Sequence, residues 1–227
     1  MNKIRAIVAC EESQAVLEEL LKLGVDAYSC DLLPTSGKYP ERHFQEDIFK
    51  VLAREDKFDL MIGHPPCTFL TVTGNAWFNV EKYGDKAIQR IKDREDALIF
   101  FIQLMEADIE HISLENPIGF VSTAYRKPNQ IISPWMFGDK TEKKTCLWTK
   151  NLPNLIPEIT EKPELEYFEW ISKKGVKKRQ SLWYYQTRCL PHSQRATAAS
   201  KTFPGIAKAL ATQYVSHILN QRNGTHR

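Results

Sequence analysis

The chain alternates short apolar runs with segments of helical periodicity, and polar residues follow each apolar run. The apolar runs cover residues 4–9, 25–30, 58–62 and 109–114, lengths that suit buried strands. The clearest helical segment covers residues 85–107, where apolar residues share one face. Strands that alternate with helices predict an α/β fold with a mostly parallel, doubly wound sheet and right-handed crossovers. In such a sheet, functional side chains lie at the carboxyl ends of the strands.

Local signals predict where the first and last helices begin and end. Ser13 is placed to cap a helix whose first apolar residue is Val16, and Gly24 is placed to end that helix in the left-handed conformation. Pro204 starts the last helix, because proline is tolerated in a first turn. The apolar residues of the last helix should form a buried stripe of Ile206, Leu210, Tyr214, Val215 and Ile218. Two further strands are expected within residues 130–148.

The composition excludes several classes of protein. Of the 227 residues, 42% are hydrophobic and 11% are aromatic, which is enough for a core and too much for a disordered chain. The longest apolar run, residues 97–102, is far shorter than the roughly 20 residues of a membrane-spanning helix. The first ten residues lack the apolar core and cleavage site of a secretory signal. We therefore expect a cytoplasmic protein with no membrane partner.

The five cysteines are widely spaced and odd in number, and no pair has zinc-ligand spacing. This arrangement predicts reduced thiols, no disulfide framework and no metal site. Most of these thiols should be small buried groups, and one or two remain available for chemistry.

Basic residues concentrate near the C-terminus. Between Ser172 and Arg195 there are seven lysines and arginines and no acidic residue, although the net charge of the chain is only +3. The cations interleave with Trp183-Tyr184-Tyr185, so they could neutralise phosphates while the rings stack on bases. The segment predicts a nucleic-acid contact, and the alternative is a solvated basic face beside buried aromatic residues. Besides Arg195, the basic residues are Lys173, Lys174, Lys177, Lys178, Arg179 and Arg188.

Cys67 follows a predicted strand directly, in the segment Gly63-His64-Pro65-Pro66-Cys67. The two prolines exclude both helix and sheet pairing, so the strand must end in a rigid loop. A thiol held on a stiff backbone at this edge of the sheet suits a nucleophile. The alternative is a small buried residue, because free cysteine is among the most buried residue types.

Glu115 occupies the equivalent place after the next predicted strand, in the segment Glu115-Asn116-Pro117. It is 48 residues beyond Cys67, the length of one helix and one strand, so the two residues could end neighbouring strands. A nucleophilic cysteine beside a carboxyl group suits addition to an electron-poor ring. The alternative is a helix cap or a surface carboxylate.

The residues around Cys67 and Glu115 resemble two motifs of DNA cytosine-5 methyltransferases. Gly63-His64-Pro65-Pro66-Cys67 resembles the Pro-Cys motif of that family, and Leu114-Glu115-Asn116-Pro117 resembles its Glu-Asn-Val motif, in the same order and at the same strand ends. Residues 45–48 are similar to the family's Asp-Ile motif, and residues 137–148 and 202–215 resemble its late strand and closing helix. The chain looks most like the small, phage-type members.

The resemblance covers most of residues 4–150 and about 195–220, and it implies a Rossmann-like S-adenosylmethionine-dependent methyltransferase fold. On this basis residues 1–150 would form the catalytic core. Residues 151–200 would be a short basic and aromatic insertion in place of a larger target recognition region. Residues 201–227 would form a C-terminal helix that returns to the core.

The resemblance also implies a reaction. Cys67 would attack carbon 6 of cytosine, so that carbon 5 takes a methyl group from S-adenosylmethionine. Glu115 would contact ring nitrogen 3 and the exocyclic amine, and Asn116 of the same motif would be a further catalytic residue. The partner would be DNA, whose target base leaves the duplex to reach the pocket. Lys143 and Lys144 stand where the family has an arginine-rich motif that steadies the flipped base.

A set of cofactor-binding residues follows from the same resemblance. Asp31 would bind the ribose hydroxyls and Asp47 the adenine amine. The turn after the first strand would lie under the methionine moiety. The implied set is Cys10, Glu11, Glu12, Ser13, Gln14, Asp31, Asp47, Ile48 and Pro65.

The chain departs from the family pattern in ways that leave two alternatives. The first turn, residues 9–14, has no glycine, Thr68 replaces the usual Gln, and only about 50 residues separate Lys150 from Ser200. The segment ending in Cys67 also looks like the Asp-Pro-Pro-Tyr motif of methyltransferases that act on the amino groups of adenine or cytosine. A second alternative is an inactive nucleic-acid-binding or antirestriction protein on the same fold.

Overall fold

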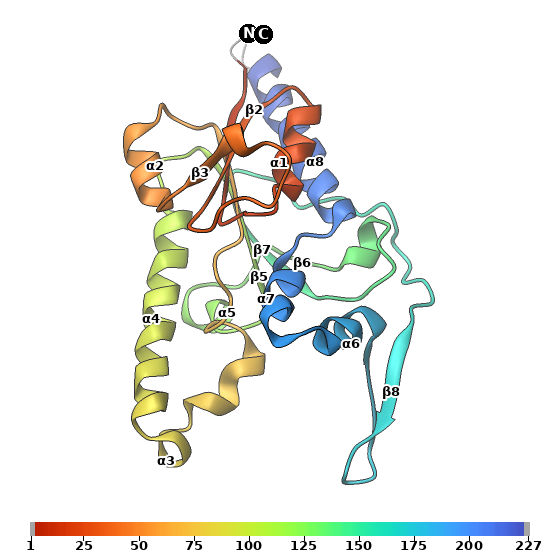
Figure 1. Ribbon diagram of the computed structural model, residues 1–227. Coiled ribbons are helices and arrows are strands. Elements are labelled where there is room, and N and C mark those ends of the chain that lie inside the picture. Colours follow the sequence, from red (N-terminus) through yellow and green to blue (C-terminus); the bar gives the residue numbers. More distant parts are fainter. Residues whose placement is uncertain (1–2, 225–227) are drawn as a thin grey trace.

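The computed structural model describes residues 3–224, except for the side chain of Ala196. A seven-stranded sheet forms its centre, with helices on both faces (Figure 1). The strands of this sheet are β1 (Arg5–Ala9), β2 (Asp26–Asp31), β3 (His43–Gln45), β4 (Leu60–Gly63), β5 (His111–Pro117), β6 (Gln130–Ile132) and β7 (Thr145–Lys150). The helices are α1 (Ala15–Lys22), α2 (Ile48–Arg54), α3 (Val80–Tyr83), α4 (Asp85–Met105), α5 (Val121–Ala124), α6 (Leu182–Cys189), α7 (His192–Ser200) and α8 (Pro204–Gly224). Short 3-10 helices cover Pro40–Arg42, Val72–Phe78 and Pro134–Phe137.

The strand order across the sheet is β3-β2-β1-β4-β5-β7-β6. The neighbours from β3 to β5 pair in parallel, whereas β7 runs antiparallel to both β5 and β6. This order, with one reversed strand inserted between β5 and β6, is that of the Rossmann-like methyltransferase fold. The predicted fold class is therefore confirmed, including the two strands expected within residues 130–148.

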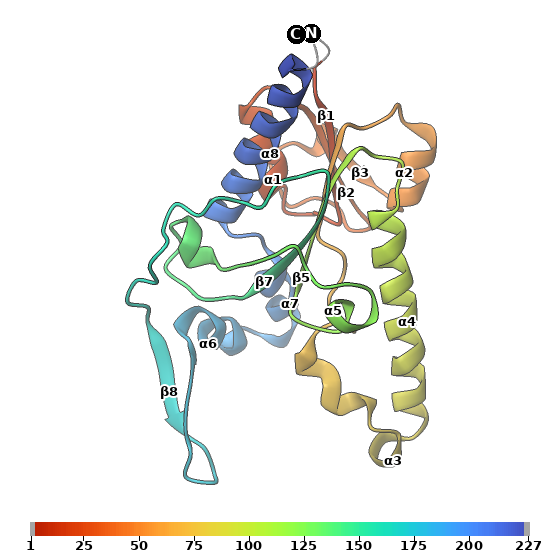
Figure 2. The same cartoon turned by 180° about the vertical axis from the view of Figure 1, so that it is seen from behind.

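Each face of the sheet has its own layer of helices and its own hydrophobic core. Helices α1 and α8 cover one face, and α2 and α4 cover the other (Figures 1 and 2). Side chains alternate along β1, so that Ala6 and Val8 belong to the first core while Ile7 and Ala9 belong to the second. Because both faces are buried, β1 is apolar from Ala6 to Ala9, as expected for a central parallel strand.

The two longest helices, α4 and α8, are both amphipathic and cover the sheet. The predicted stripe of α8 is confirmed, since all five of its residues are buried, from Ile206 to Ile218. Helix α4 buries Phe101 and Leu104 against the opposite face of the sheet. Among the residues that the structure describes, no helix has the length and apolar character needed to span a membrane.

The N-terminus of α1 is capped differently from the prediction. Gly24 does have a left-handed backbone, with φ of 75°, so this part of the prediction is confirmed. However, Ser13 is not the cap: Gln14 occupies the cap position with φ of 58° and makes no side-chain bond to the helix. Instead, the Glu11 carboxylate accepts a hydrogen bond from the amide of Val16, the second residue of the helix, at 2.7 Å. A longer side chain placed further back in the turn therefore fills the role that was assigned to Ser13.

Strand β5 is longer than the apolar pattern predicts. It continues through Glu115 and Asn116 to Pro117, because β7 pairs antiparallel with these residues. Glu115 therefore lies within the last part of a strand rather than after it. Pairing with a partner strand some 30 residues later in the chain decides this extension.

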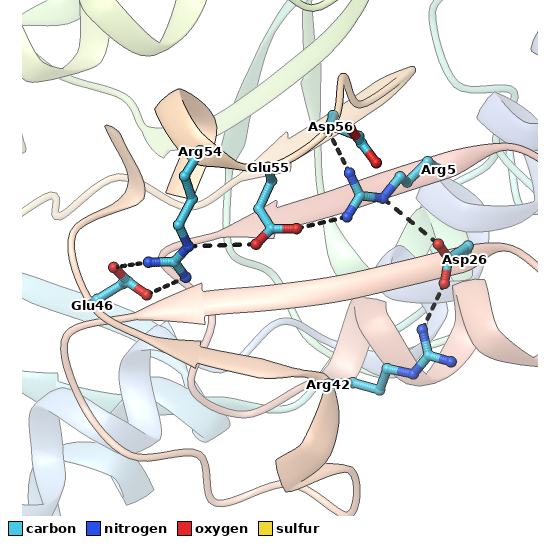
Figure 3. Close-up of polar contacts among 7 residues, drawn as sticks. All are labelled: Arg5, Asp26, Arg42, Glu46, Arg54, Glu55 and Asp56. Atoms are coloured by element: carbon cyan, nitrogen blue, oxygen red, sulfur yellow. Dashed lines mark hydrogen bonds and ion pairs between the residues drawn. The ribbon is translucent and has the colours of Figure 1, made fainter. Parts of the chain in front are cut away.

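An ion-pair network joins β1, β2 and α2 (Figure 3). Asp26 lies between Arg5 and Arg42, and its Oδ1 accepts from Arg42 Nη1 at 2.6 Å. Arg54 bridges to Glu46 through both terminal nitrogens, at 2.6 and 2.5 Å. Exposed pairs of this kind contribute at most about 1 kcal/mol each. Their main effect here is to fix the chain that leads from β3 into α2.

The segment between β7 and α8 was expected only as a short insertion, and it has a structure that the sequence analysis did not predict. Strands β8 (Tyr167–Ile171) and β9 (Lys177–Ser181) form a separate antiparallel hairpin. The hairpin extends away from the seven-stranded sheet, and α6 and α7 connect it to α8 (Figures 1 and 2). The division of the chain at residues 150 and 200 remains a prediction, and residues 225–227 of the predicted terminal helix lie outside the described range.

Candidate active site

The carboxyl ends of β1, β4 and β5 meet at one edge of the sheet. Gly63 at the end of β4 pairs with Leu114 of β5, so that the next residues, His64 and Glu115, lie side by side. The amide of His64 donates to the carbonyl of Ala9 at the end of β1, at 2.9 Å. The expectation that the segments of Cys67 and Glu115 end neighbouring strands is therefore confirmed.

His64 and Glu115 form a hydrogen-bonded pair in which Nδ1 lies 3.2 Å from Oε2. Burial raises the pKa of Glu115. The hydrogen bond from His64 and the charges of Lys143 and His64 lower this pKa by more, so the net shift is downward. Burial lowers the pKa of His64, but Glu115 and then Glu11 outweigh this effect and raise it. Both shifts favour an ion pair of histidinium and carboxylate. The buried Nε2 of His64 has no hydrogen-bond partner within the described part of the chain.

Asn116 lies behind the loop and fixes it. Its side chain is 1% exposed, and its Nδ2 donates to the carbonyl of Pro65 at 2.8 Å. The structure thus places Asn116 where it positions the loop that carries Cys67. A catalytic role of Asn116 remains a prediction, and Asn116 would act through this loop.

Cys67 itself is exposed to solvent, in contrast to the alternative of a small buried residue. Its carbonyl accepts from the amides of Leu70 and Thr71, at 3.0 and 3.1 Å, which forms a tight turn. Desolvation of the sulfur and the negative charge of Glu115 raise the pKa of Cys67, and the charge of Lys143 offsets part of this rise. The resting side chain is therefore a thiol, and its proton must leave when the sulfur attacks.

Two arginines of α4 anchor the segment that follows Cys67, and the sequence analysis did not identify them. Arg94 Nε donates to the carbonyl of Phe69 at 3.1 Å, and its guanidinium carbon lies 3.2 Å from the ring centroid of Phe78. Arg90 Nη2 donates to the carbonyl of Thr68 at 3.2 Å. Spacing of four residues on one helix face is the only sequence signal for this pair. The turn after Cys67 is thereby fixed to the rigid helix α4.

A cavity of about 390 Å³, here called the acidic cavity, opens beside this loop. Its acidic lining residues are Asp31, Glu46, Asp47, Asp93 and Asp96. The apolar and thiol groups of its wall include Cys10, Leu32, Ile48, Pro66, Phe69 and Phe100. Four of the predicted cofactor-binding residues thus line the cavity: Cys10, Asp31, Asp47 and Ile48. Asp47 also caps α2, because its Oδ1 accepts from the amide of Phe49 at 2.8 Å.

The other predicted cofactor-binding residues do not line the cavity, and their part in cofactor binding remains a prediction. Glu11 is 3% exposed and is turned inward to cap α1, and burial raises its pKa although His64 and the amides of Val16 and Leu17 partly oppose this. Gln14 accepts from the amide of Tyr39 at 2.9 Å and donates to the carbonyl of Tyr39 at 2.8 Å. Glu12, Ser13 and Pro65 are also absent from the lining, where Pro66 stands instead of Pro65.

The glycine-free first turn reaches a glycine-like backbone by another route. Cys10 and Gln14 both have φ of 58°, in the left-handed region. Residues other than glycine adopt this region rarely, because the Cβ atom crowds the backbone. The hydrogen bonds of Glu11 and Gln14 hold the turn in this conformation. The absence of glycine therefore does not prevent the turn from closing against the cavity.

The predicted nucleic-acid-binding residues divide into two groups. Lys143 lies near the reactive residues, since its charge acts on Cys67, Glu115 and His64, while Lys144 is exposed. The others lie on the hairpin and on α6, where the exposed residues are Lys173, Lys174, Lys177, Lys178, Arg179 and Arg188. The hairpin is not purely basic, because Lys177 Nζ pairs with Glu169 Oε2 at 2.7 Å.

No protein-family model matches the chain, and no curated protein matches it. Among solved structures, an E. coli prophage protein described as a DNA modification methyltransferase aligns over 70% of this chain and 52% of its own, with 14% identity and a TM-score of 0.43. The Entamoeba histolytica methyltransferase EhMeth aligns over 74% and 59%, with 11% identity and a TM-score of 0.41. The S. pombe Dnmt2 methyltransferase aligns over 67% and 51%, with 14% identity and a TM-score of 0.37. This chain thus spans between half and three fifths of these proteins.

Proposed function

We propose that this protein transfers a methyl group from S-adenosylmethionine to carbon 5 of cytosine in DNA, through a covalent bond to Cys67. One observation carries the proposal. Pro66 lines the acidic cavity, and the next residue, Cys67, is exposed and lies within electrostatic range of Glu115. A pocket for a methyl donor and a nucleophile for its acceptor therefore share one rigid loop.

The acidic cavity suits S-adenosylmethionine in both size and charge. Its volume lies within the roughly 300–1,000 Å³ that is typical of small-molecule sites. S-adenosylmethionine carries a positive sulfonium and a positive ammonium group, which the surrounding carboxylates complement. Asp31 would hold the ribose hydroxyls and Asp47 the adenine amine, against an apolar wall that includes Ile48. When bound there, S-adenosylmethionine supplies the methyl group for the reaction.

The chain's own residues would perform the remaining steps on cytosine. The sulfur of Cys67 bonds to carbon 6, and the electron pair of the carbon 5–carbon 6 double bond becomes available at carbon 5. The proton of the thiol passes through Glu115 to ring nitrogen 3, which keeps the adduct neutral. After carbon 5 has taken the methyl group, its own proton leaves to solvent and the sulfur–carbon 6 bond breaks. The proton on nitrogen 3 then returns to the thiolate, which restores the resting thiol.

The His64–Glu115 ion pair fits these roles. His64 holds one oxygen of Glu115, so the other oxygen can accept a hydrogen bond from the exocyclic amine of cytosine. Lys143 favours the thiolate of Cys67, because its positive charge lowers the pKa of that thiol against the effect of burial. The target base must leave the helix to reach this site if the substrate is duplex DNA.

The proposal is tested with a covalent trap. DNA that contains 5-fluorocytosine should form a complex with the protein that survives denaturing electrophoresis and requires S-adenosylmethionine, because fluorine cannot leave carbon 5 as a proton does. Cys67→Ala should abolish both the complex and methyl transfer. Cys189→Ala is the matched control, since Cys189 is also exposed but lies in α6.

Three results would contradict the proposal. Full methyl transfer by Cys67→Ala would exclude the covalent mechanism. A nucleoside digest of methylated DNA distinguishes the products, because amino-methylated bases would indicate the amino-group alternative. If calorimetry shows that S-adenosylmethionine binds but the digest contains no methylated base, the protein would instead be an inactive member of the fold.

A further inference from the structure

A second cavity, here called the C-terminal groove, lies between α6, α7 and the start of α8 and has a volume of about 580 Å³. The rings of Trp183 and Phe203 form part of its wall, with their centroids 5.0 Å apart. The polar groups of the wall are Ser193, Gln194, Thr197, Lys201 and Thr202. Within the part of the chain that the structure describes, the wall contains no acidic residue. The groove thus offers aromatic faces, hydrogen-bonding groups and a cation.

The chain segment that forms the C-terminal groove, residues 183–204, contains lysine and arginine but no acidic residue. Glu169 is the last acidic residue of the sequence, and 11 lysines and arginines follow it. Three of them, Arg188, Arg195 and Lys201, are exposed on α6, on α7 and at the junction with α8. A surface of this composition is complementary to a polyanion, and the two rings can stack with bases.

Lys143 connects the C-terminal groove to the reactive residues. Its Nζ donates to the carbonyl of Ala199 in α7 at 2.9 Å. The same atom lies 5.7 Å from the centroid of the Trp183 ring and 5.9 Å from that of Phe203. The charge of Lys143 also acts on Cys67 and Glu115, so this one side chain interacts with both the groove and the reactive residues.

The position of the groove is fixed by contacts outside its wall. Asp139 Oδ2 accepts from the amide of Gly205 at 3.0 Å, which ties the start of α8 to the segment before β7. A Cβ atom at Gly205 would lie 1.9 Å from the carbonyl oxygen of Phe137, so the two backbones are in close contact. The aromatic wall is therefore held at a set position relative to Lys143.

We infer that the C-terminal groove binds the nucleic-acid strand next to the target base, with a neighbouring base stacked against Trp183 and Phe203 and a phosphate near Lys201. The inference rests on the proposed function, because it assigns a place to the substrate of the same site. Binding here would use α6 and α7, which carry Trp183, Gln194 and Thr197, in addition to the basic hairpin. It would keep the strand in contact with Lys143 while the target base reaches Cys67.

The test measures binding without methylation. A fluorescent single-stranded DNA of about 12 nucleotides that lacks cytosine is titrated with the protein, without S-adenosylmethionine, and its anisotropy is recorded. Lys201→Glu should weaken binding at least about tenfold and reduce its salt dependence. Lys208→Glu makes the same charge change on an exposed residue of α8 outside the groove, and it should weaken binding less than threefold.

A second pair of variants tests the aromatic wall. Trp183→Phe keeps a ring and should retain most of the affinity, whereas Trp183→Leu should lower it by about five- to tenfold. Thermal unfolding of each variant checks that the fold is intact. Parallel titrations with duplex DNA and with RNA of the same sequence identify which nucleic acid binds most tightly. If Lys201→Glu binds that nucleic acid more weakly than wild type does, the inference is supported.

The outcomes separate this inference from the proposed function. If Lys201→Glu and Lys208→Glu weaken binding equally, only diffuse charge is involved and the groove is not the site. If Trp183→Leu binds as well as Trp183→Phe, no base stacks there. If binding depends on the groove but no 5-methylcytosine is ever formed, the inference stands and the proposed function fails.

Discussion

Two turns at the same edge of the sheet use their polar residues in opposite ways. The turn after β1, residues 10–14, directs Glu11 and Gln14 inward, where they bond to backbone groups. The loop after β4, residues 64–67, leaves Cys67 exposed and His64 Nε2 without a partner in the described range. The two strands are paired neighbours, with Ala9 opposite Gly63. Polar residues at neighbouring strand ends therefore differ in whether the fold itself uses them.

The difference arises from the chain segment that comes directly after each strand. A helix starts immediately after the first turn, and its free amides must find acceptors, which Glu11 supplies. Two prolines come after β4, and they have no amide hydrogens to satisfy. The side chains of the second loop are consequently available for a substrate. Three predictions test this comparison.

The largest effect is expected from Glu115→Gln, which changes the hydrogen-bond partner of His64 in the loop after β4. Methyl transfer should fall by about 10²- to 10³-fold, because the neutral amide can neither relay a proton nor pair with His64. The midpoint of thermal unfolding should change little by comparison. The measurement is transfer of labelled methyl groups to DNA, beside a melting curve. A variant that unfolds instead would mean that Glu115 is structural, like Glu11.

A smaller effect, on stability rather than activity, is expected from Glu11→Ala. The variant loses two acceptors for α1 amides in a buried place, which should lower the free energy of unfolding by about 2–3 kcal/mol. Glu12→Ala is the matched control, because Glu12 is only half-buried, and it should cost less than about 1 kcal/mol. Urea denaturation measures both. Equal costs would show that Glu11 is not the cap that the structure assigns.

The smallest effect concerns pH, through the His64–Glu115 pair. The raised pKa of His64 means that its stabilising contribution is complete below about pH 6.5 and is lost as the pH rises through the folded-state pKa. The lowered pKa of Glu115 means that its contribution is present above about pH 4.5 and is lost as the pH falls through the lowered value. Wild type should therefore exceed His64→Asn in unfolding free energy most between about pH 4.5 and 6.5. A difference that does not vary with pH would refute the ion pair.

The sequence was sufficient for the order of the main strands of the central sheet and for placing the segments of Cys67 and Glu115 after neighbouring strands. Buried parallel strands are recognisable because they are short and apolar, and their carboxyl ends share one edge by topology. The stripe of α8 was equally clear, from Ile206 to Ile218, because it depends only on helical spacing. These features depend on patterns within a few turns or strands of the chain.

The remaining features depend on contacts between distant segments, which a pattern cannot show. Several polar residues come after β1, and the turn geometry decides that Glu11 rather than Ser13 caps α1. The extension of β5 through Glu115 depends on pairing with β7. The anchoring of the turn after Cys67 depends on Arg90 and Arg94, whose guanidinium groups gain partners only when α4 docks.

The anchoring by Arg90 and Arg94 has a consequence for how a substrate meets the thiol. Two guanidinium groups already hold the backbone carbonyls of Thr68 and Phe69, so this wall acquires its shape during folding and not on encounter. Little ordering entropy is then left to be lost when a base arrives. The shape of the loop beside Cys67 should therefore not depend on the length of the oligonucleotide that reaches it.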